Sequence, residues 1–156
     1  CKLSLLLLRQ MDIYLDIDGV LITKDLKAAN YAEEFVRYVV ENYPDSTYWL
    51  TTRCGEDTSK VLWYFEPIFS KETIEAMKAI KPISLLAEKT AYINFSRPFL
   101  WFDDNLFLKD RQKLMQHVVI DNLIQVDLAK DPDQLQKFIH DFPLPVNHGD
   151  SNVDKY

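Results

Sequence analysis

The sequence predicts an α/β domain with a central parallel sheet, and three observations lead to this fold class. Four short segments are mostly apolar, which is typical of parallel strands buried on both faces. Segments with the 3.6-residue period of amphipathic helices separate these strands. The chain has 156 residues, which corresponds to one domain at roughly 100–200 residues per domain. We therefore expect a three-layer α/β/α sandwich in which strands and helices alternate.

The four apolar segments have the short length of strands in compact domains. Asp16 ends the first of them and Asp103 follows the third, so an acidic residue marks the end of both. The second includes Thr51 near its end. The predicted strands span residues 13–15, 48–52, 99–102 and 123–126.

Five other segments have helical periodicity. In the first, apolar side chains recur at helical spacing on one face, and Pro44 ends the pattern. Asp57 or Thr58 can cap the second helix, Ser70 opens the third and Pro132 starts the last. The predicted helices span residues 32–43, 58–65, 70–80, 109–116 and 132–142.

We expect a single domain over residues 11–142, because the first convincing strand directly follows Met11. Residues 1–10 then form an N-terminal extension and residues 143–156 a loose C-terminal tail. The longest apolar run, Leu3 to Leu8, is far below the roughly 20 residues that a bilayer needs. We therefore expect no membrane-spanning segment.

Composition excludes several classes of protein. A hydrophobic content of 47% excludes an intrinsically disordered chain. Two cysteines cannot build a disulfide framework, so a reducing cytoplasm is the expected location. With only 3 glycines, neither a phosphate-binding P-loop nor a dinucleotide fingerprint can be written. A net charge of −6 disfavours non-specific nucleic-acid binding, although a local basic patch would be compatible with it.

Acidic residues and a threonine gather where the predicted strands end. Asp16 and Asp18 follow the first strand, Thr51 lies near the end of the second, and Asp103 and Asp104 follow the third. In open α/β sheets such groups converge on one crevice at the carboxyl ends of the strands. Carboxylates about 4 Å apart repel one another by roughly 4 kcal/mol at an effective dielectric near 20. Oxygen ligands without nearby His or Cys favour Mg²⁺ over Zn²⁺ as the cation that relieves this repulsion.

These residues resemble the motifs of the haloacid-dehalogenase-like hydrolase superfamily. Residues 13–20, Ile-Tyr-Leu-Asp-Ile-Asp-Gly-Val, are similar to its first motif, an apolar strand followed by DxDG. Leu50 and Thr51 match the second motif, and residues 101–104, Trp-Phe-Asp-Asp, match the acidic fourth motif. The family requires a lysine between them, and Lys89 is the best-placed candidate.

The resemblance implies a role for each of these residues. Asp16 would be the nucleophile that forms an aspartyl-phosphate intermediate. Asp18 would protonate the leaving oxygen and then deprotonate the attacking water. Thr51 would donate a hydrogen bond to a phosphoryl oxygen. Lys89 would neutralise charge on the nucleophile and the phosphate; Lys81 is the alternative lysine.

The resemblance also implies a Mg²⁺ site. Asp16 and the backbone carbonyl of Asp18 would be ligands, together with Asp103 and Asp104. In this acidic pair we favour Asp104 for the direct bond. Thr52 and Arg53 are further candidates for binding the substrate. The Arg53 guanidinium could form a fork onto phosphate oxygens or be an ordinary solvated loop side chain.

The gaps between the motifs leave no room for a folded cap domain, so the chain resembles the capless group of the superfamily. An open site suits a phosphate on a macromolecule, or a small substrate enclosed by a partner subunit. The leading interpretation is a Mg²⁺-dependent phosphohydrolase that cleaves phosphomonoesters and acts as a monomer or small homo-oligomer. The alternatives are a polynucleotide-end phosphatase of the repair type and a catalytically silent binding module with the same fold.

Overall fold

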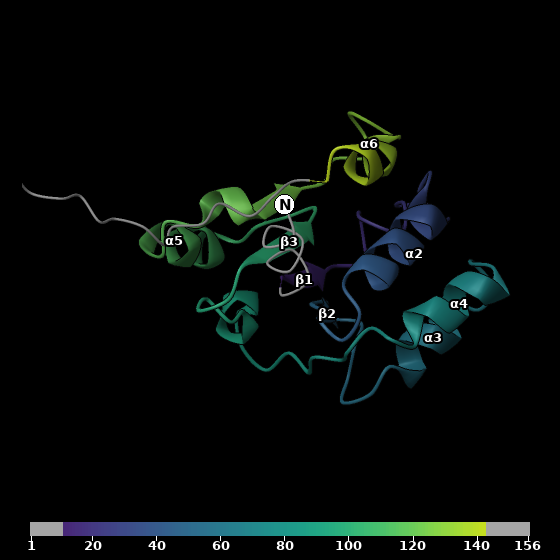
Figure 1. Cartoon of the computed structure of the whole chain (residues 1–156), viewed down its shortest axis with the longest axis horizontal. Coiled ribbons are helices and arrows are strands. Elements are labelled where there is room, and N and C mark those ends of the chain that lie inside the picture. Colours follow the sequence, from purple (N-terminus) through teal and green to yellow (C-terminus); the bar gives the residue numbers. More distant parts are fainter. Residues whose placement is uncertain (1–10, 143–156) are drawn as a thin grey trace, which may run out of the picture.

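The computed structural model of the chain describes residues 11–142. The expected extension at residues 1–10 and tail at 143–156 lie outside the described residues. Within the described part, four parallel strands form one sheet in the order β2-β1-β3-β4 (Figure 1). The strands are β1 (Asp12–Leu15), β2 (Thr47–Trp49), β3 (Phe99–Asp103) and β4 (Leu123–Gln125). The predicted α/β class with a parallel sheet is confirmed.

Five α-helices and two 3₁₀-helices accompany the described strands. The predicted N-cap at Ser70 is present, because the Ser70 hydroxyl accepts a hydrogen bond from the Thr73 backbone N–H at 3.3 Å. The helices are α2 (Ala32–Asn42), α3 (Ser59–Phe65), α4 (Lys71–Met77), α5 (Leu108–Gln116), α6 (Gln134–His140), η1 (Lys89–Tyr92) and η2 (Ile120–Asn122).

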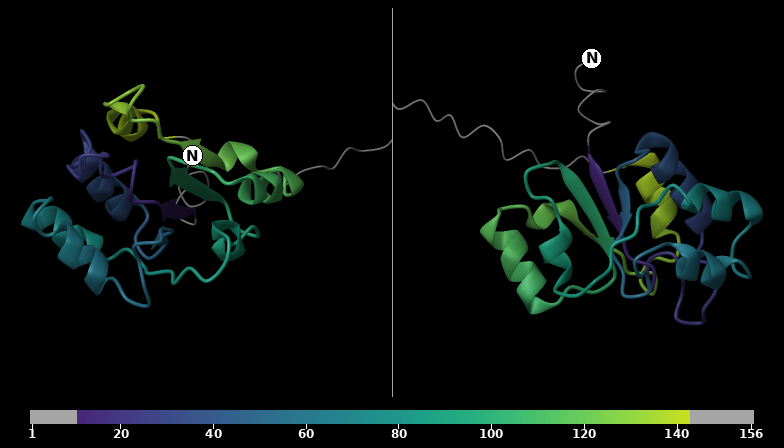
Figure 2. Two further views of the ribbon diagram at one scale, coloured as in Figure 1. Left: turned by 180° about the vertical axis from the view of Figure 1, so that it is seen from behind. Right: turned by 90° about the horizontal axis from the view of Figure 1, so that it is seen from below.

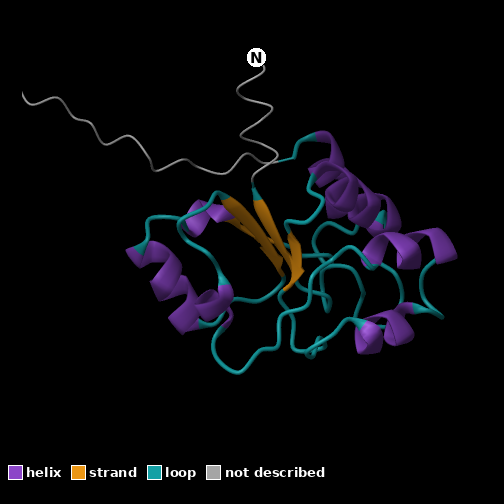
Figure 3. Cartoon of the chain, turned by 60° about the horizontal axis from the view of Figure 1, so that its bottom comes forward, coloured by secondary structure: helices purple, strands orange, loops and turns teal. Residues whose placement is uncertain are grey.

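Helices lie on both sides of the sheet (Figure 3). Figure 2 shows η1 and α5 on one side and α2 and α6 on the other. Alternate residues of β1 belong to different apolar clusters: Ile13 and Leu15 join the larger one, whereas Tyr14 joins the smaller one. Because successive side chains of a strand point to opposite faces, both faces of the sheet are buried. This explains why the strand segments are mostly apolar.

The second strand ends earlier than the sequence predicts. We expected residues 48–52, but β2 ends at Trp49 and the chain bends at Thr51. The Leu50 N–H still donates to the Leu15 carbonyl at 2.8 Å. Beyond it, the Thr51 hydroxyl accepts a hydrogen bond from the Arg53 N–H at 3.3 Å, which turns the chain away from the sheet.

The strand order fixes where a site can form. The chain runs from β1 to β2 on one side and returns to β3 on the other, so the strand order reverses at β1. Ligands of open α/β sheets bind at such a point, outside the carboxyl ends of the strands. Among residues 11–142, no helix is long and apolar enough to cross a membrane.

Candidate active site

Three carboxylates meet at the carboxyl ends of β1 and β3. Leu15 pairs with Phe102 in the parallel register, and the Asp16 N–H donates to the Phe102 carbonyl at 3.0 Å. This register places Asp16 beside Asp103, the last residue of β3. Ligand oxygens of Asp16, Asp103 and Asp104 all lie within 4.8 Å of one another. The sheet therefore brings together the acidic residues that the sequence placed at two separate strand ends.

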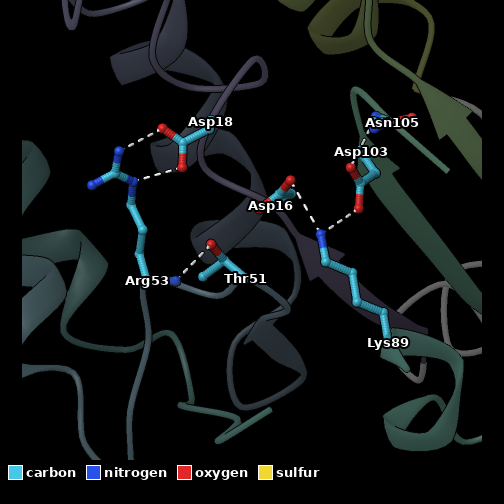
Figure 4. Close-up of polar contacts among 7 residues, drawn as sticks. All are labelled: Asp16, Asp18, Thr51, Arg53, Lys89, Asp103 and Asn105. Atoms are coloured by element: carbon cyan, nitrogen blue, oxygen red, sulfur yellow. Dashed lines mark hydrogen bonds and ion pairs between the residues drawn. The ribbon is translucent and has the colours of Figure 1, made fainter. Parts of the chain in front are cut away.

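Lys89 supplies the cation of this cluster. Its Nζ lies 3.2 Å from Asp16 Oδ2 and 2.6 Å from Asp103 Oδ2 (Figure 4). The Lys89 side chain is largely buried, with 14% of its surface exposed. One ammonium group thus faces three carboxylates, which leaves the cluster with a surplus of negative charge when all three are ionised.

The surplus charge changes the pKa values of the cluster. Burial raises the pKa of Asp16 to about 6, and the nearby Asp103 adds to this effect while Lys89 opposes it. Burial also raises the pKa of Asp103, against the opposing effect of Lys89. For Asp104, burial and the charge of Asp16 act together to raise the pKa. Burial lowers the pKa of Lys89, but its two carboxylate neighbours outweigh that effect and raise it overall.

The donor set fits a hard divalent cation. It consists of carboxylate oxygens only, and ions such as Mg²⁺ and Ca²⁺ prefer oxygen ligands. A divalent cation would also compensate the charge that Lys89 leaves unbalanced. Asp16, Asp103 and Asp104 are therefore the residues that could hold a metal ion.

Gly19 allows a close approach between the loop after β1 and Asp104. Its φ is +75°, a conformation that residues with a side chain rarely adopt. A Cβ at this position would lie 2.2 Å from Asp104 Oδ2. The glycine of the first motif is thus required both by backbone geometry and by the carboxylate beside it.

Asp18 does not join the carboxylate cluster. Its two carboxylate oxygens accept hydrogen bonds from Arg53 Nε at 2.6 Å and Arg53 Nη2 at 2.8 Å (Figure 4). The Arg53 guanidinium also lies 4.3 Å from the centre of the Tyr64 ring. Asp16 and Asp18 are two positions apart, and their side chains would lie on one side only if the strand continued through both. However, β1 ends at Leu15, and the strand period no longer applies beyond it.

The remaining candidates lie around this arrangement. Thr51 is fully buried beyond β2, and its hydroxyl accepts the hydrogen bond from the Arg53 N–H. Thr52 is exposed and lines a groove together with Lys89. Lys81 lies elsewhere, with its Nζ 5.7 Å from the centre of the Tyr48 ring, in a pocket that includes Asp12. The structure therefore brings Lys89 to the carboxylates and keeps Lys81 away from them.

One buried residue of the site region was not expected from the sequence. Asp110, in the first turn of α5, is 2% exposed, and its Oδ1 accepts hydrogen bonds from the Thr90 N–H at 3.1 Å and the Thr90 hydroxyl at 2.9 Å. Thr90 follows Lys89 in η1, so this contact anchors the turn that carries the lysine. Nothing in the sequence identifies Asp110, since an aspartate between Lys109 and Arg111 is typical of a solvated helix face.

Comparisons of the chain with protein-family models, with curated proteins and with solved structures found no match. A function must therefore follow from the chemistry of the residues at the ends of β1 and β3.

Proposed function

We propose that the protein is a Mg²⁺-dependent phosphohydrolase that cleaves phosphomonoesters through a phosphorylated Asp16. One observation carries the proposal: Asp16 lies 3.2 Å from the Lys89 ammonium and within 4.8 Å of the acidic pair Asp103 and Asp104. This combination provides a carboxylate nucleophile, a cation for the phosphate and oxygen ligands for a metal ion in one place. The motif order that resembles haloacid-dehalogenase-like hydrolases supports the same assignment.

In the proposed reaction an Asp16 oxygen attacks phosphorus, a P–O bond to Asp16 forms and the ester P–O bond breaks. The alcohol leaves with a proton from Asp18. A water molecule then attacks the phosphorus, Asp18 accepts its proton, and the bond to Asp16 breaks to release inorganic phosphate. Lys89 stabilises the charge on the phosphoryl oxygens, and the Thr51 hydroxyl donates a hydrogen bond to one of them.

Mg²⁺ would be held by Asp16, Asp103, Asp104 and the backbone carbonyl of Asp18. When bound, it supplies positive charge that allows an anionic phosphate to approach the carboxylates. Asp103 is oriented by its neighbours, because its Oδ1 accepts a hydrogen bond from the Asn105 N–H at 3.1 Å while Oδ2 contacts Lys89.

Arg53 has two roles in this proposal. At rest its guanidinium holds Asp18 through two hydrogen bonds. A phosphate dianion offers the same fork geometry and competes for Arg53, since guanidinium groups bind phosphate in a bidentate manner. Binding of substrate would then free the Asp18 carboxylate, which takes up a proton from solvent before it protonates the leaving alcohol.

We also propose that the fold is a three-layer sandwich without a cap domain. Between Asp18 and Thr51 the chain forms one turn region, α2 and β2, and between Thr51 and Lys89 it forms α3 and α4. Neither segment builds a separate domain over the site. A cytoplasmic location and a monomeric or small homo-oligomeric state stay predictions.

The proposal is tested by measuring phosphate release from sugar phosphates, nucleotides, phosphopeptides and alkyl phosphates, with Mg²⁺ or with excess chelator. We expect hydrolysis that requires Mg²⁺ and is lost in Lys89→Met, whereas Lys81→Met retains it. The two lysines form a matched pair, because only Lys89 contacts the carboxylates. Full activity in excess chelator, or a Lys89→Met protein as active as wild type, would refute the proposal.

Phosphorylated oligonucleotides with 3′- or 5′-phosphates belong in the same assay, because they test the polynucleotide-end alternative. The net charge of −6 disfavours such a substrate. No hydrolysis of any phosphate ester, by a folded protein that binds Mg²⁺, would favour the silent binding module.

A further inference from the structure

A large groove lies directly beside the candidate site. Its volume is about 940 Å³, within the range of small-molecule sites in proteins. Its wall is formed by the segment that leads into η1 and by the start of α5, together with Thr52. Lys89 belongs both to this wall and to the carboxylate cluster. A phosphate bound at Asp16 would therefore lie beside Lys89, a residue of the groove wall.

The groove exposes an unusual set of large apolar side chains. Leu86 is 91% exposed, Leu108 70% and Phe107 67%, and all three line the groove. They come from two segments of the chain that flank Lys89. Contiguous exposed apolar surface costs free energy in water and marks binding sites in soluble proteins. The position of these side chains beside Lys89 indicates that the bound group is part of the phosphate-bearing molecule.

The charged side chains of the groove already have partners. Lys109 Nζ lies 3.2 Å from Glu88 Oε1, Asp110 accepts two hydrogen bonds from Thr90, and Lys89 faces the carboxylates. A second phosphate would have to compete with Glu88 for Lys109, the cation of the groove that lies outside the carboxylate cluster. A polynucleotide backbone or a polyphosphate would meet mainly apolar side chains here, whereas an uncharged apolar group fits the lining.

We propose that this groove binds the alcohol portion of the substrate, and that the substrate is a small phosphomonoester of an apolar alcohol. The inference rests on the proposed function for the position of the phosphate. It adds the chemical class of the group on the other side of the ester bond.

A homologous series of alkyl phosphates from ethyl to hexyl tests the groove directly. Burial of each methylene should raise kcat/KM by about twofold to fourfold. Hexyl phosphate should then exceed ethyl phosphate by at least about tenfold. A flat series, in an enzyme that hydrolyses ethyl phosphate, would overturn the inference and leave the proposed function intact.

Two variants test whether the groove side chains cause the dependence of kcat/KM on chain length. Phe107→Ser and Leu86→Ser should flatten the chain-length dependence, because they should lower kcat/KM for hexyl phosphate far more than for ethyl phosphate. Both side chains are largely exposed, and serine is a preferred residue at the N-cap position that Phe107 occupies in α5, so the fold should persist. Trp63→Ser is the matched control. Trp63 is 77% exposed and lines a different apolar pocket with Leu26. Loss of the dependence in Trp63→Ser, with the groove variants unaffected, would assign the alcohol to that pocket instead.

A binding experiment separates failure of this inference from failure of the proposed function. Ethyl and hexyl phosphonates contain a P–C bond that is not hydrolysed, and their affinities can be measured by calorimetry in the presence of Mg²⁺. Hexyl phosphonate should bind at least about tenfold more tightly, and Phe107→Ser should remove the difference. This result without turnover of any ester would refute the hydrolase and support the groove. Equal affinities, or a phosphopeptide preferred in a way that Phe107→Ser does not change, would refute the groove.

Discussion

The two ends of strand β1 carry buried aspartates in different surroundings. Asp12 begins the strand and is 3% exposed, and Asp16 follows its last residue and is 7% exposed. Asp12 lies 3.1 Å and 3.2 Å from Arg97 Nε through its two carboxylate oxygens. Asp16 shares the ammonium of Lys89 with Asp103. One end of the strand thus sets one carboxylate against two cations, Arg97 and Lys81, and the other crowds carboxylates around a single cation.

The two surroundings separate an aspartate that stabilises the fold from one that can take part in a reaction. Burial raises the pKa of both aspartates, so a raised pKa alone does not separate them. At Asp12 the charge of Arg97 acts against burial, whereas at Asp16 the charge of Asp103 adds to it. The uncompensated negative charge, rather than burial, is the feature that a metal ion and a phosphate would complete.

The greatest loss of turnover should follow substitution of Asp16, and the same substitution of Asp12 provides the comparison. Asp16→Asn keeps the shape and removes the nucleophile, so turnover should fall by at least about 10⁴-fold. Asp12→Asn removes a carboxylate of similar burial at the other end of β1, and turnover should stay close to that of the wild-type protein. Steady-state phosphate release with a purified, folded sample of each variant measures both. Similar losses in the two variants would show that activity depends on the integrity of the strand and not on the chemistry of Asp16.

Asp18 tests whether pairing with an arginine marks a structural acid. Like Asp12, Asp18 contacts an arginine at both oxygens, but it lies beside the candidate site. If it acts in proton transfer, Asp18→Asn should lower kcat by about 10²–10⁴-fold with alkyl phosphates. The loss should be smaller with p-nitrophenyl phosphate, whose leaving group hardly needs a proton. An equal loss with both substrates would assign Asp18 a structural role like that of Asp12.

Asp110 extends the comparison to an acid that acts through its neighbours. It is buried, accepts hydrogen bonds from Thr90 and thereby positions Lys89. Displacement of a catalytic group by about 1 Å can cost about 10²-fold, so Asp110→Ala should lower kcat by about 10–100-fold. Asp110→Asn keeps the Oδ1 acceptor and should restore most of the activity. Lys109→Met, which removes only the exposed pair with Glu88, is the control.

A loss in Asp110→Ala that Asp110→Asn does not rescue would contradict the positioning role. Calorimetric unfolding of each variant identifies any loss that is due to global instability instead.

The acidic residues could be predicted from the sequence because they end strands that are mostly apolar. The parallel sheet then brings strand ends together whatever the details of the loops, which is why Asp16 and Asp103 meet. The lysine of the site was harder to predict, since Lys81 and Lys89 both lie between the motifs. The structure separates them because Lys81 follows α4 at the amino-terminal side of β1, near Asp12, and η1 turns Lys89 toward the carboxylates.

Contacts between segments far apart in the chain could not be predicted. Asp18 and Arg53 are 35 positions apart and Thr90 and Asp110 are 20 apart, and no local pattern links either pair. The apolar groove could not be predicted for the same reason, because it forms only when η1 packs against α5. Sequence periodicity reports which face of an element is buried, but it does not report which exposed side chains meet on the surface.

The weakest effect concerns the free energy of unfolding of the metal-free protein. It is measured for substitutions of the same two aspartates. The pKa of Asp16 in the fold is about 6, above its ordinary value of about 3.9 in an unfolded chain. The folded state therefore binds the proton more tightly, and its stability falls as the pH rises from about 4 to about 6 and stays lower above that range.

Asp16→Asn removes this loss. Its free energy of unfolding should exceed that of the wild-type protein by about 1–3 kcal/mol at pH 7.5 and differ little at pH 4.5. The change in Asp12→Asn should be smaller, because Arg97 offsets part of the burial cost at that end of β1. Urea unfolding in excess chelator at the two pH values measures both variants.

Addition of Mg²⁺ should then stabilise the wild-type protein more than Asp16→Asn, because a ligand that binds only the folded state shifts the unfolding equilibrium. A less stable Asp16→Asn at pH 7.5 would mean that Lys89 already balances the cluster, and the distinction between the two ends of β1 would be lost.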